Sequence, residues 1–292
     1  MKVLLIDPSL YTPPYDGALA EALTRRGHEV TLAGRARRGS DPPFGGEVRL
    51  LPLFYRDGER LLRYGRAAQV AKGFEHATGL GQLRRLVVAE RPDVVHWQWP
   101  SLPWLDAAAL QVLSRYAPQV VTVHDGRVFK TKRGLRRLQS AGWGRFVRAA
   151  DAVIAHVAST RTALAGFGVA PERVVLVPHP IFARPAAEPA ADARGRARPR
   201  LCVLFFGRLS RDKGIDVLAT ALERLPEAAH ARLHVVVCGP ALREDAGVAE
   251  AVGKLRRLRG VDLRLGFVPE AALDARLAKA DLVVLPHREV DA

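Results

Sequence analysis

The chain has 292 residues, of which 48% are hydrophobic and 26% charged, a composition typical of a soluble protein large enough for two domains. The 45 Lys and Arg residues outnumber the 30 Asp and Glu residues, and the net charge of +15 favours anionic partners such as nucleic acid, phosphorylated metabolites or an anionic membrane face. Apolar runs are too short to cross a bilayer, and Asp7 interrupts the first one too early for a signal peptide.

Short apolar runs alternate with amphipathic segments in the first part of the chain. The runs predict strands at KVLLID, HEVTLAG, EVRLLPL, DVVHW, QVVTVHD, DAVIAH and RVVLVPH. Helices are predicted between most of them, including a long basic region from about Gly58 to Glu90. Strands that are almost continuously apolar and separated by helices indicate a parallel sheet covered on both faces.

A second series of the same kind follows a change of composition. Residues 183–199 are rich in Pro, Ala and Arg and predict an interdomain linker. Beyond them, strands are predicted at LCVLFF, RLHVVVCG, VDLRLG and DLVVLP, again with helices between. The sequence thus predicts an α/β chain with two Rossmann-like domains, at 1–182 and 200–292. A ligand is expected at the carboxyl ends of the strands, in the cleft between the domains.

Two cations stand where the first strand of the second domain gives way to a helix, in FFGRLSRDKGIDVLATAL. Gly207 allows the backbone to approach a ligand closely, and Arg208 and Lys213 follow it. A solvated polar loop would account for these charges. A diphosphate would account for them as well, because Arg offers a planar fork, Lys a point charge and the helix N-terminus a partial positive charge.

Histidines also fall at predicted strand ends. His124 and Asp125 form a candidate acid/base or positioning pair, although a histidine that only forms a hydrogen bond there is equally compatible with the pattern. His96 and His179 end other strands without metal-ligand spacing, so the sequence predicts no metal site. The chain has no G-x-G-x-x-G, Walker or G-x-S-x-G motif, which disfavours NAD-binding, P-loop and serine hydrolase functions.

The stretch 127–148 is strongly basic, with apolar residues interleaved and no acidic residue. It is expected to be either a solvated helical face or a basic amphipathic surface that meets anionic lipid. Nucleic acid is an unlikely partner, because no recognised binding motif accompanies the charge. Only Cys202 and Cys238 occur, both in apolar runs, which fits a cytoplasmic protein, soluble or peripheral at the inner face of the membrane.

The stretch FFGRLSRDKGIDVLATAL resembles the donor-binding stretch of GT-B glycosyltransferases, in particular that of the retaining family 4 enzymes. Other segments are similar in the same order over nearly the whole chain: RRGHEVTLAG, DVVHWQWP, VVTVHD, ADAVIAH, VVLVPHP, RLHVVVCGP and DLRLGFVPEAALDARLAKADLVVLP. The resemblance implies that the first domain binds the acceptor and the second a nucleotide diphosphate-sugar. It implies sugar transfer with retention to a glycan, lipid-linked or small-molecule acceptor, without a cofactor or metal.

The resemblance also implies roles for particular residues. Arg208 and Lys213 would hold the diphosphate and stabilise the negative charge on the leaving group, and His124 would lie near the sugar. These three are the catalytic candidates. The implied donor-binding set is Gly207, Arg208, Lys213, Gly239, Pro240, Phe267 and Val268. On the acceptor side, the resemblance points to Gly17, Asp125 and His179.

Two departures from the family pattern affect the expected activity. The loop at Gly17 usually has two glycines, and here it reads YDG. The family carries a pair of glutamates, which hold the sugar and the ribose, just after a strand like ADLVVLP, and the sequence ends before such a pair. The resemblance therefore implies a C-terminally truncated second domain and makes activity of this chain uncertain. The alternative is a non-catalytic glycosyltransferase-like fragment that acts as a binding module or partner subunit.

Overall fold

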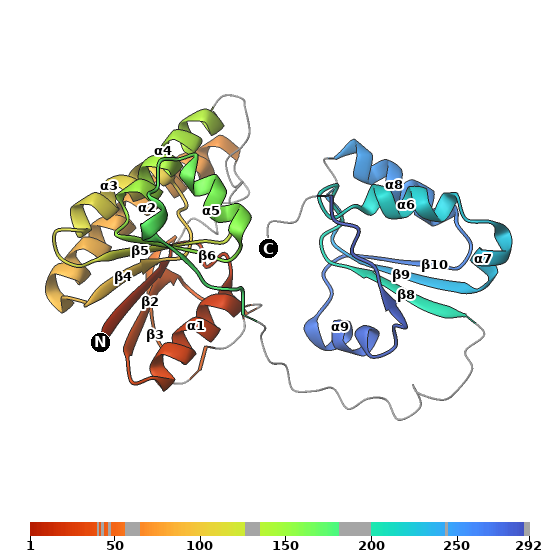
Figure 1. Cartoon of the computed structure of the whole chain (residues 1–292), viewed down its shortest axis with the longest axis horizontal. Coiled ribbons are helices and arrows are strands. Elements are labelled where there is room, and N and C mark those ends of the chain that lie inside the picture. The colour runs from red at the N-terminus through yellow and green to blue at the C-terminus, as the bar shows by residue number, and fades with distance from the viewer. Residues whose placement is uncertain are drawn as a thin grey trace. The chain divides into compact units, whose positions relative to one another are not determined.

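A computed structural model of the chain divides into two compact units. Unit 1 comprises Met1–Phe182 with Asp291–Ala292, and unit 2 comprises Ala183–Val290. Each is a parallel α/β structure (Figure 1). The predicted linker at 183–199 lies outside the described residues. The structure describes residues 1–39, 41, 44–45, 48–55, 65–125, 135–180, 200–242 and 245–288, with the backbone alone for 65–69 and 135–141.

The described part of unit 1 contains a seven-stranded sheet in the order β3-β2-β1-β4-β5-β6-β7. Every neighbouring pair is parallel, as the apolar runs predicted. The strands are β1 (Lys2–Asp7), β2 (Glu29–Arg35), β3 (Arg49–Phe54), β4 (Val94–Trp97), β5 (Gln119–Val123), β6 (Ala152–Ala155) and β7 (Val174–Leu176).

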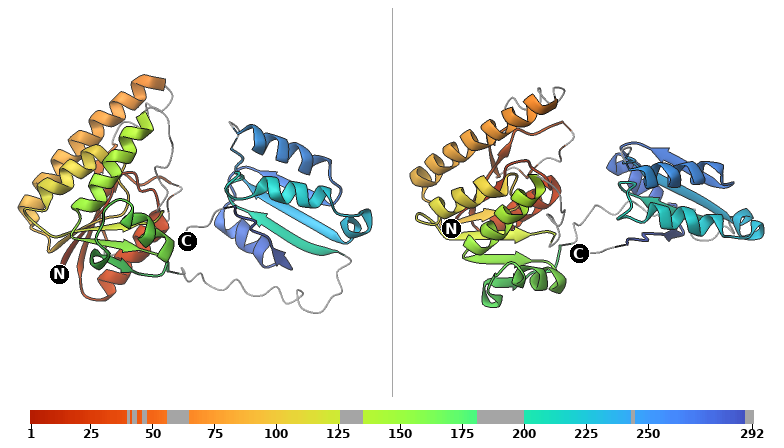
Figure 2. Two further views of the ribbon diagram at one scale, coloured as in Figure 1. Left: turned by 45° about the horizontal axis from the view of Figure 1, so that its top comes forward. Right: turned by 90° about the horizontal axis from the view of Figure 1, so that it is seen from above.

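Helices cover both faces of this sheet (Figure 2). They are α1 (Pro13–Arg25), α2 (Gly65–Glu90), α3 (Pro103–Leu113), α4 (Leu135–Ala149) and α5 (Ala158–Ala165), with a short 3-10 turn at Pro171–Arg173. Prolines at the first helical positions of α1 and α3 favour helix starts there, because proline has no N–H to leave unbonded. The first helix begins at Pro13, so Gly17 lies within this helix and not in the loop expected from the resemblance.

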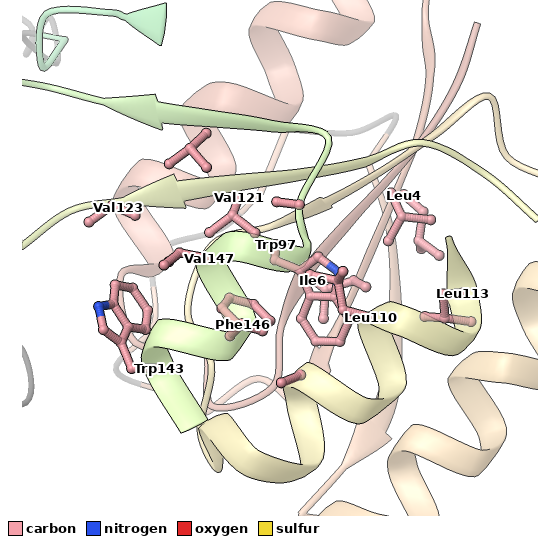
Figure 3. Close-up of a cluster of buried hydrophobic side chains, with 14 of the residues drawn as sticks. Leu4, Ile6, Trp97, Leu110, Leu113, Val121, Val123, Trp143, Phe146 and Val147 are labelled. Carbon is pink, nitrogen blue, oxygen red and sulfur yellow. The ribbon is translucent and has the colours of Figure 1, made fainter. Parts of the chain in front are cut away.

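The alternation of side chains along β1 builds a core on each side of the sheet. Leu4 and Ile6 join the larger core with residues of α2, α3 and α4, part of which Figure 3 shows around Trp97 and Phe146. Val3 and Leu5 pack on the opposite face, in the core that includes Ala20 of α1. Because β1 is buried on both faces, the carboxyl end of the strand is held in a fixed position.

The described part of unit 2 contains a four-stranded parallel sheet in the order β10-β9-β8-β11. Its strands are β8 (Leu201–Phe206), β9 (Leu233–Gly239), β10 (Val261–Leu265) and β11 (Leu282–Val283). Its helices are α6 (Ile215–Glu223), α7 (Glu227–Ala231), α8 (Ala246–Arg257) and α9 (Glu270–Leu277). The buried residues of α6 and α8 pack against β8 and β9 in one core, and Figure 1 shows α9 on the other side of the sheet.

Gly239 fixes how the ends of β8 and β9 meet. Its φ of +144° disfavours other residues, and a Cβ there would clash with the carbonyl oxygen of Gly207. Beyond this contact, the N–H of Leu209 donates to the carbonyl of Pro240 at 2.9 Å. The loops after β8 and β9 are therefore tied together at the carboxyl edge of the sheet.

The predicted fold class is confirmed in both units. The observed elements differ from the predicted ones only at particular segments. The short helix α7 was not predicted, and the last strand of unit 1 ends at Leu176, before the VPH segment. No helix in the described part of the chain has the length and apolarity to cross a membrane.

Candidate functional site

Polar side chains gather where the strands of unit 1 end. Asp7 is the last residue of β1, Gln98 follows β4, His124 follows β5, and His156 follows β6. The parallel register pairs Val123 with Ala155, so the two histidines leave the sheet as neighbours. Parallel strands bring such positions to one edge, which is where α/β proteins bind ligands.

The loop between β1 and α1 is organised by the Asp7 carboxylate. It accepts backbone N–H hydrogen bonds from Ser9 at 3.1 Å and Tyr11 at 2.6 Å. From the other side, the buried Arg35 donates from Nε to the carbonyl of Ser9 at 2.8 Å and pairs with Asp41 at 2.7 Å. The loop that approaches the site is thus held by two buried charged side chains.

Asp16 is a second buried carboxyl group at this edge, in the first turn of α1. It is fully buried, and the side chain with which it interacts is that of Asp7. Burial and the neighbouring charge of Asp7 raise the pKa of Asp16 well above its usual value. Burial also raises the pKa of Asp7 to about 6, although backbone N–H bonds favour its charged form. Such a coupled pair is expected to share a proton near neutral pH.

A chain of hydrogen bonds leads from the sheet interior to His124. Thr122 Oγ1 lies 2.7 Å from His96 Nε2, Gln98 Nε2 lies 3.3 Å from the same nitrogen, and His124 Nε2 lies 3.2 Å from Gln98 Oε1. The Gln98 amide nitrogen donates toward His96, and the Gln98 oxygen can only accept. His124 Nε2 therefore donates to that oxygen, and the lone pair of the His124 ring is on Nδ1. Burial lowers the pKa of His96 to about 4 and, with neighbouring histidines, that of His124 to about 3. His124 is therefore neutral at physiological pH, suited to hydrogen bonding rather than to proton donation as a cation.

Aromatic rings surround His124. Trp99 stacks on it with centroids 4.9 Å apart and planes 11° apart, and Tyr15 meets it edge-on at 4.6 Å. His156 and His179 lie on other sides of Tyr15, at 5.6 and 5.4 Å. The structure thus brings the predicted site residues His124 and His179 together, with His156 between them. One ring nitrogen of each of the three histidines lies within 4.8 Å of those of the other two.

The predicted cations of unit 2 lie in the loop between β8 and α6. Arg208 is exposed, Lys213 is half-buried, and neither forms an ion pair with a described residue. Asp212 stands between them in the sequence. Burial raises the pKa of Asp212, but a hydrogen bond with Ser210 and the charges of Arg208 and Lys213 lower it overall. The two cations therefore act on one neighbouring anionic group.

The first turn of α6 carries an ion pair of its own, between the Asp216 carboxylate and Arg288. The Arg288 ion pair is the main reason that the pKa of Asp216 is lowered. The binding of a phosphate at the N–H groups of this turn stays a prediction.

The other predicted donor-side residues follow β9 and β10. Gly239 ends β9 next to Gly207, and Pro240 follows it. The N–H of Gly266 donates to the Gly239 carbonyl at 3.0 Å, which brings the end of β10 to the same edge. Phe267 is 78% exposed there, and Val268 is half-buried. The whole predicted set in unit 2 therefore lies along one edge of one sheet.

The surroundings of two predicted acceptor-side residues, Gly17 and Asp125, do not point to a particular role in binding. Gly17 is buried within α1, where a Cβ would lie 2.8 Å from the Phe44 ring, so packing accounts for a glycine at this position. Asp125 is half-buried directly after His124.

Five residues at the edge of unit 1 were not predicted as site residues: Asp7, Asp16, Gln98, Tyr15 and His156. His156 could have been found, because it follows DAVIA as His124 follows QVVTV.

The described part of the basic stretch 127–148 shows where its apolar side chains lie. Trp143, Phe146 and Val147 are buried in the main core of unit 1. Arg145 is exposed and donates to Gln111 Oε1 at 2.7 Å. Residues 126–134 lie outside the described residues. The apolar side of the described part of α4 therefore faces the core, and lipid would meet only its charged side.

Two Rossmann-like units, the second with a cation-bearing loop at the carboxyl edge of its sheet, define the GT-B class of glycosyltransferase folds. The family model described as Glycosyltransferase Family 4 matches residues 17–183, more than half of the chain. The model described as Glycosyl transferases group 1 matches residues 190–290. The chain therefore belongs to glycosyltransferase family 4, as the resemblance predicted.

Curated relatives agree with this assignment. The glycogen synthase of Mycobacterium tuberculosis (strain CDC 1551 / Oshkosh) is 28% identical over 291 aligned residues, which cover 92% of this chain and 66% of that protein. The glycogen synthase of strain ATCC 25618 / H37Rv matches with the same identity and coverage. The chain thus spans just under two thirds of the length of these relatives.

Solved structures show the same fold. Sucrose-phosphate synthase from Thermosynechococcus elongatus has a TM-score of 0.70 at 18% identity, with 100% of this chain and 77% of that chain covered. Anabaena Alr3699/HepE, solved in complex with UDP and glucose, has a TM-score of 0.63 at 20% identity, covering 100% and 75%. WaaG, a glycosyltransferase involved in lipopolysaccharide biosynthesis, has a TM-score of 0.67 at 19% identity, covering 99% and 76%.

The buried carboxyl pair predicts a stability effect that depends on pH. A carboxyl group with a raised pKa in the folded state stabilises at low pH, and this contribution is lost as pH rises through the folded-state pKa. Asp16→Asn removes one ionisable group, so the stability of the variant relative to the wild type should increase from pH 5.5 to pH 8. The gain should appear as Asp16 of the wild type becomes ionised, because burial and the charge of Asp7 disfavour the ionised form. Urea unfolding followed by tryptophan fluorescence measures it, because Trp97, Trp99, Trp104 and Trp143 all lie in unit 1.

The matched control is Glu29→Gln, which removes an exposed carboxylate from the same unit. Its stability relative to the wild type should not change with pH over this range. A difference for Asp16→Asn that stays constant from pH 5.5 to pH 8 would contradict the raised pKa.

Proposed function

We propose that this chain binds a nucleoside diphosphate-sugar in unit 2 and transfers the sugar, with retention of configuration, to a glycan, lipid-linked or small-molecule acceptor at unit 1. Membership of glycosyltransferase family 4 supports the reaction class. The observation that carries the donor side is the pair Arg208 and Lys213, which has no ion-pair partner among the described residues and stands at the carboxyl edge of the unit 2 sheet.

The chemistry of the proposed step needs fixed positive charge. When the bond between the sugar and the diphosphate breaks, negative charge develops on the leaving group. A guanidinium can bind two phosphate oxygens at once, and an ammonium adds a compact charge. Groups held in place before the reaction stabilise that charge without reorganisation. Arg208 and Lys213 would supply this stabilisation.

The neutral histidine suits a different part of the reaction. Sugars present hydroxyl groups, which are recognised by hydrogen bonds to oriented neutral groups. His124 is held by Gln98 in the Nε2–H form, and burial keeps its pKa low. In the proposal, His124 Nδ1 accepts a hydrogen bond from a sugar hydroxyl. Asp125, Gly17 and His179 remain acceptor-side candidates.

The first test is nucleotide binding by isothermal titration calorimetry. UDP is the first probe because solved complexes of the similar HepE contain UDP and UDP-glucose, and GDP and ADP follow. Arg208→Ala and Lys213→Ala should each weaken binding by about tenfold to a hundredfold, because each removes a charge-assisted bond worth about 1.5–3 kcal/mol. Together they should abolish it.

Arg256→Ala is the control, because Arg256 is an exposed cation of unit 2 on the last turn of α8. It should bind the nucleotide as the wild type does. Equal affinity in the wild type and the double variant would reject the assigned roles, and absence of binding by every nucleotide would count against a donor site in this chain. Nucleotide binding without release of UDP from UDP-glucose, with any acceptor tried, would favour the non-catalytic alternative.

An anionic membrane surface is proposed as a further partner of unit 1. The basic stretch 127–148 supports it through charge alone, because the buried Trp143 and Phe146 of α4 are not available for insertion. Electrostatic attraction to acidic lipid is worth about 1 kcal/mol for each basic residue near the surface and is screened by salt.

This proposal predicts binding that depends on both lipid charge and salt. In vesicle co-sedimentation, the chain should bind vesicles of phosphatidylcholine with phosphatidylglycerol, and it should dissociate in high salt. Arg136→Glu with Arg137→Glu should weaken binding at least tenfold, whereas Arg256→Glu with Arg257→Glu in unit 2 should have little effect. Equal recovery with neutral and anionic vesicles would overturn the proposal.

A further inference from the structure

Three histidines converge at the carboxyl edge of the unit 1 sheet from separate segments of the chain. His124 follows β5, His156 follows β6, and His179 comes three residues after β7. Each offers a ring nitrogen, and these nitrogens lie within 4.8 Å of one another. The ring centroids of His124 and His156 are 5.2 Å apart, and those of His156 and His179 are 5.0 Å apart.

His156 at the centre of the group has one nitrogen that the rest of the unit does not use. Its Nδ1 lies 2.8 Å from the carbonyl oxygen of Val177 and so carries the proton. Its Nε2 consequently bears the lone pair. This nitrogen is buried without a hydrogen-bond partner among the described residues, and the residue is only 6% exposed. A buried acceptor without a partner costs free energy, so an unpartnered imidazole here requires an explanation.

The other two histidines are held in the same manner. His124 Nε2 faces Gln98 Oε1 at 3.2 Å, and His179 Nδ1 faces the Pro180 carbonyl at 3.1 Å. In both contacts the ring nitrogen donates its N–H to the oxygen, which fixes the direction of the opposite nitrogen. A hydrogen bond from one ring nitrogen to a carbonyl oxygen is the usual way in which proteins orient the other nitrogen toward a metal ion.

We propose that His124, His156 and His179 form a binding site for a divalent transition metal ion of the zinc class. Imidazole nitrogens are preferred ligands of Zn²⁺, Co²⁺ and Ni²⁺, and three protein ligands leave a fourth position for water. A bound ion takes the lone pair of His124 Nδ1, so the ion and the sugar hydroxyl of the proposed function would exclude each other at this nitrogen. Trp99 stacks on His124 and Tyr15 meets it edge-on, so aromatic rings flank this ligand.

The geometry is close to what a bound ion requires. A tetrahedral zinc ion with bonds of about 2.0–2.1 Å to nitrogen separates its ligand nitrogens by about 3.4 Å. The widest separation in the group therefore has to shorten by somewhat more than 1 Å. His179 is exposed and can supply this movement by rotating its side chain.

Neither the spacing of the histidines nor the family resemblance predicted a metal site. Here the ligands are 32 and 23 residues apart along the chain, from residue 124 to 156 and from 156 to 179. The register of β5, β6 and β7 brings them together, since Ala155 pairs with both Val123 and Leu176. Such a site cannot be recognised from spacing alone.

Metal binding to the untagged, chelator-treated chain tests the proposal without reference to activity. Titration with Co²⁺ should produce the visible absorption of a tetrahedral nitrogen-ligated ion that saturates at one equivalent, and Zn²⁺ should displace it. Co²⁺ should also quench tryptophan fluorescence, because Trp99 stacks on His124. His156→Gln and His179→Gln should each weaken Co²⁺ binding at least tenfold. His28→Gln and His234→Gln, which change histidines outside the group, should have no effect.

Either of two results would overturn the proposal. One is the absence of a saturable one-equivalent absorption band in the wild type, which would mean that the three histidines form only an aromatic and hydrogen-bonded cluster. The other is an affinity that is unchanged in His179→Gln, or reduced as much by His28→Gln. His179 is exposed, so its variant is expected to fold even if the buried His156→Gln does not, and tryptophan fluorescence on urea unfolding checks both.

Discussion

The parallel register of the two sheets is the constraint on which the other features depend. In unit 1, Val123, Ala155 and Leu176 lie side by side, so the residues after them leave the sheet at one place. In unit 2, Phe206 pairs with Cys238, and Gly239 with Leu265, which gathers the loops that carry Arg208 and Phe267. The buried apolar cores hold the strands, and the strands determine which polar groups can meet. A change in register by one residue would reverse the direction of these side chains.

The two edges have opposite electrostatic character. At the edge of unit 1, burial suppresses charge: it raises the pKa of Asp7 and Asp16 and lowers that of His96 and His124. At the edge of unit 2, Arg208 is exposed and Lys213 half-buried, and both interact with Asp212. Neutral oriented groups suit sugar hydroxyls, whereas exposed cations suit a diphosphate. The contrast supports the proposed function, in which unit 1 meets the sugar and acceptor and unit 2 holds the nucleotide.

The fold could be predicted from the sequence because it depends on local patterns. Apolar runs such as KVLLID and LCVLFF are recognisable as strands because their side chains are buried on both faces of a sheet. Pro13 marks a helix start because proline has no N–H to leave unbonded, and Gly27 and Gly214 lie at helix ends because they adopt positive φ angles. The cation pair was found for the same reason, since Arg208 and Lys213 are close in sequence. The histidine group and the Asp7–Asp16 pair depend on strand order and register. The Asp216–Arg288 ion pair at the first turn of α6 joins residues far apart in the chain.

Amide hydrogen exchange of the whole chain with and without UDP is the measurement that tests the central claim most directly. The claim is that a nucleoside diphosphate binds at the carboxyl edge of the unit 2 sheet, between the loop that carries Arg208 and Lys213 and the end of β9. The account predicts slower exchange on adding UDP in residues 207–214 and around Gly239. Slower exchange confined to other segments, with residues 207–214 unchanged at saturating UDP, would contradict it.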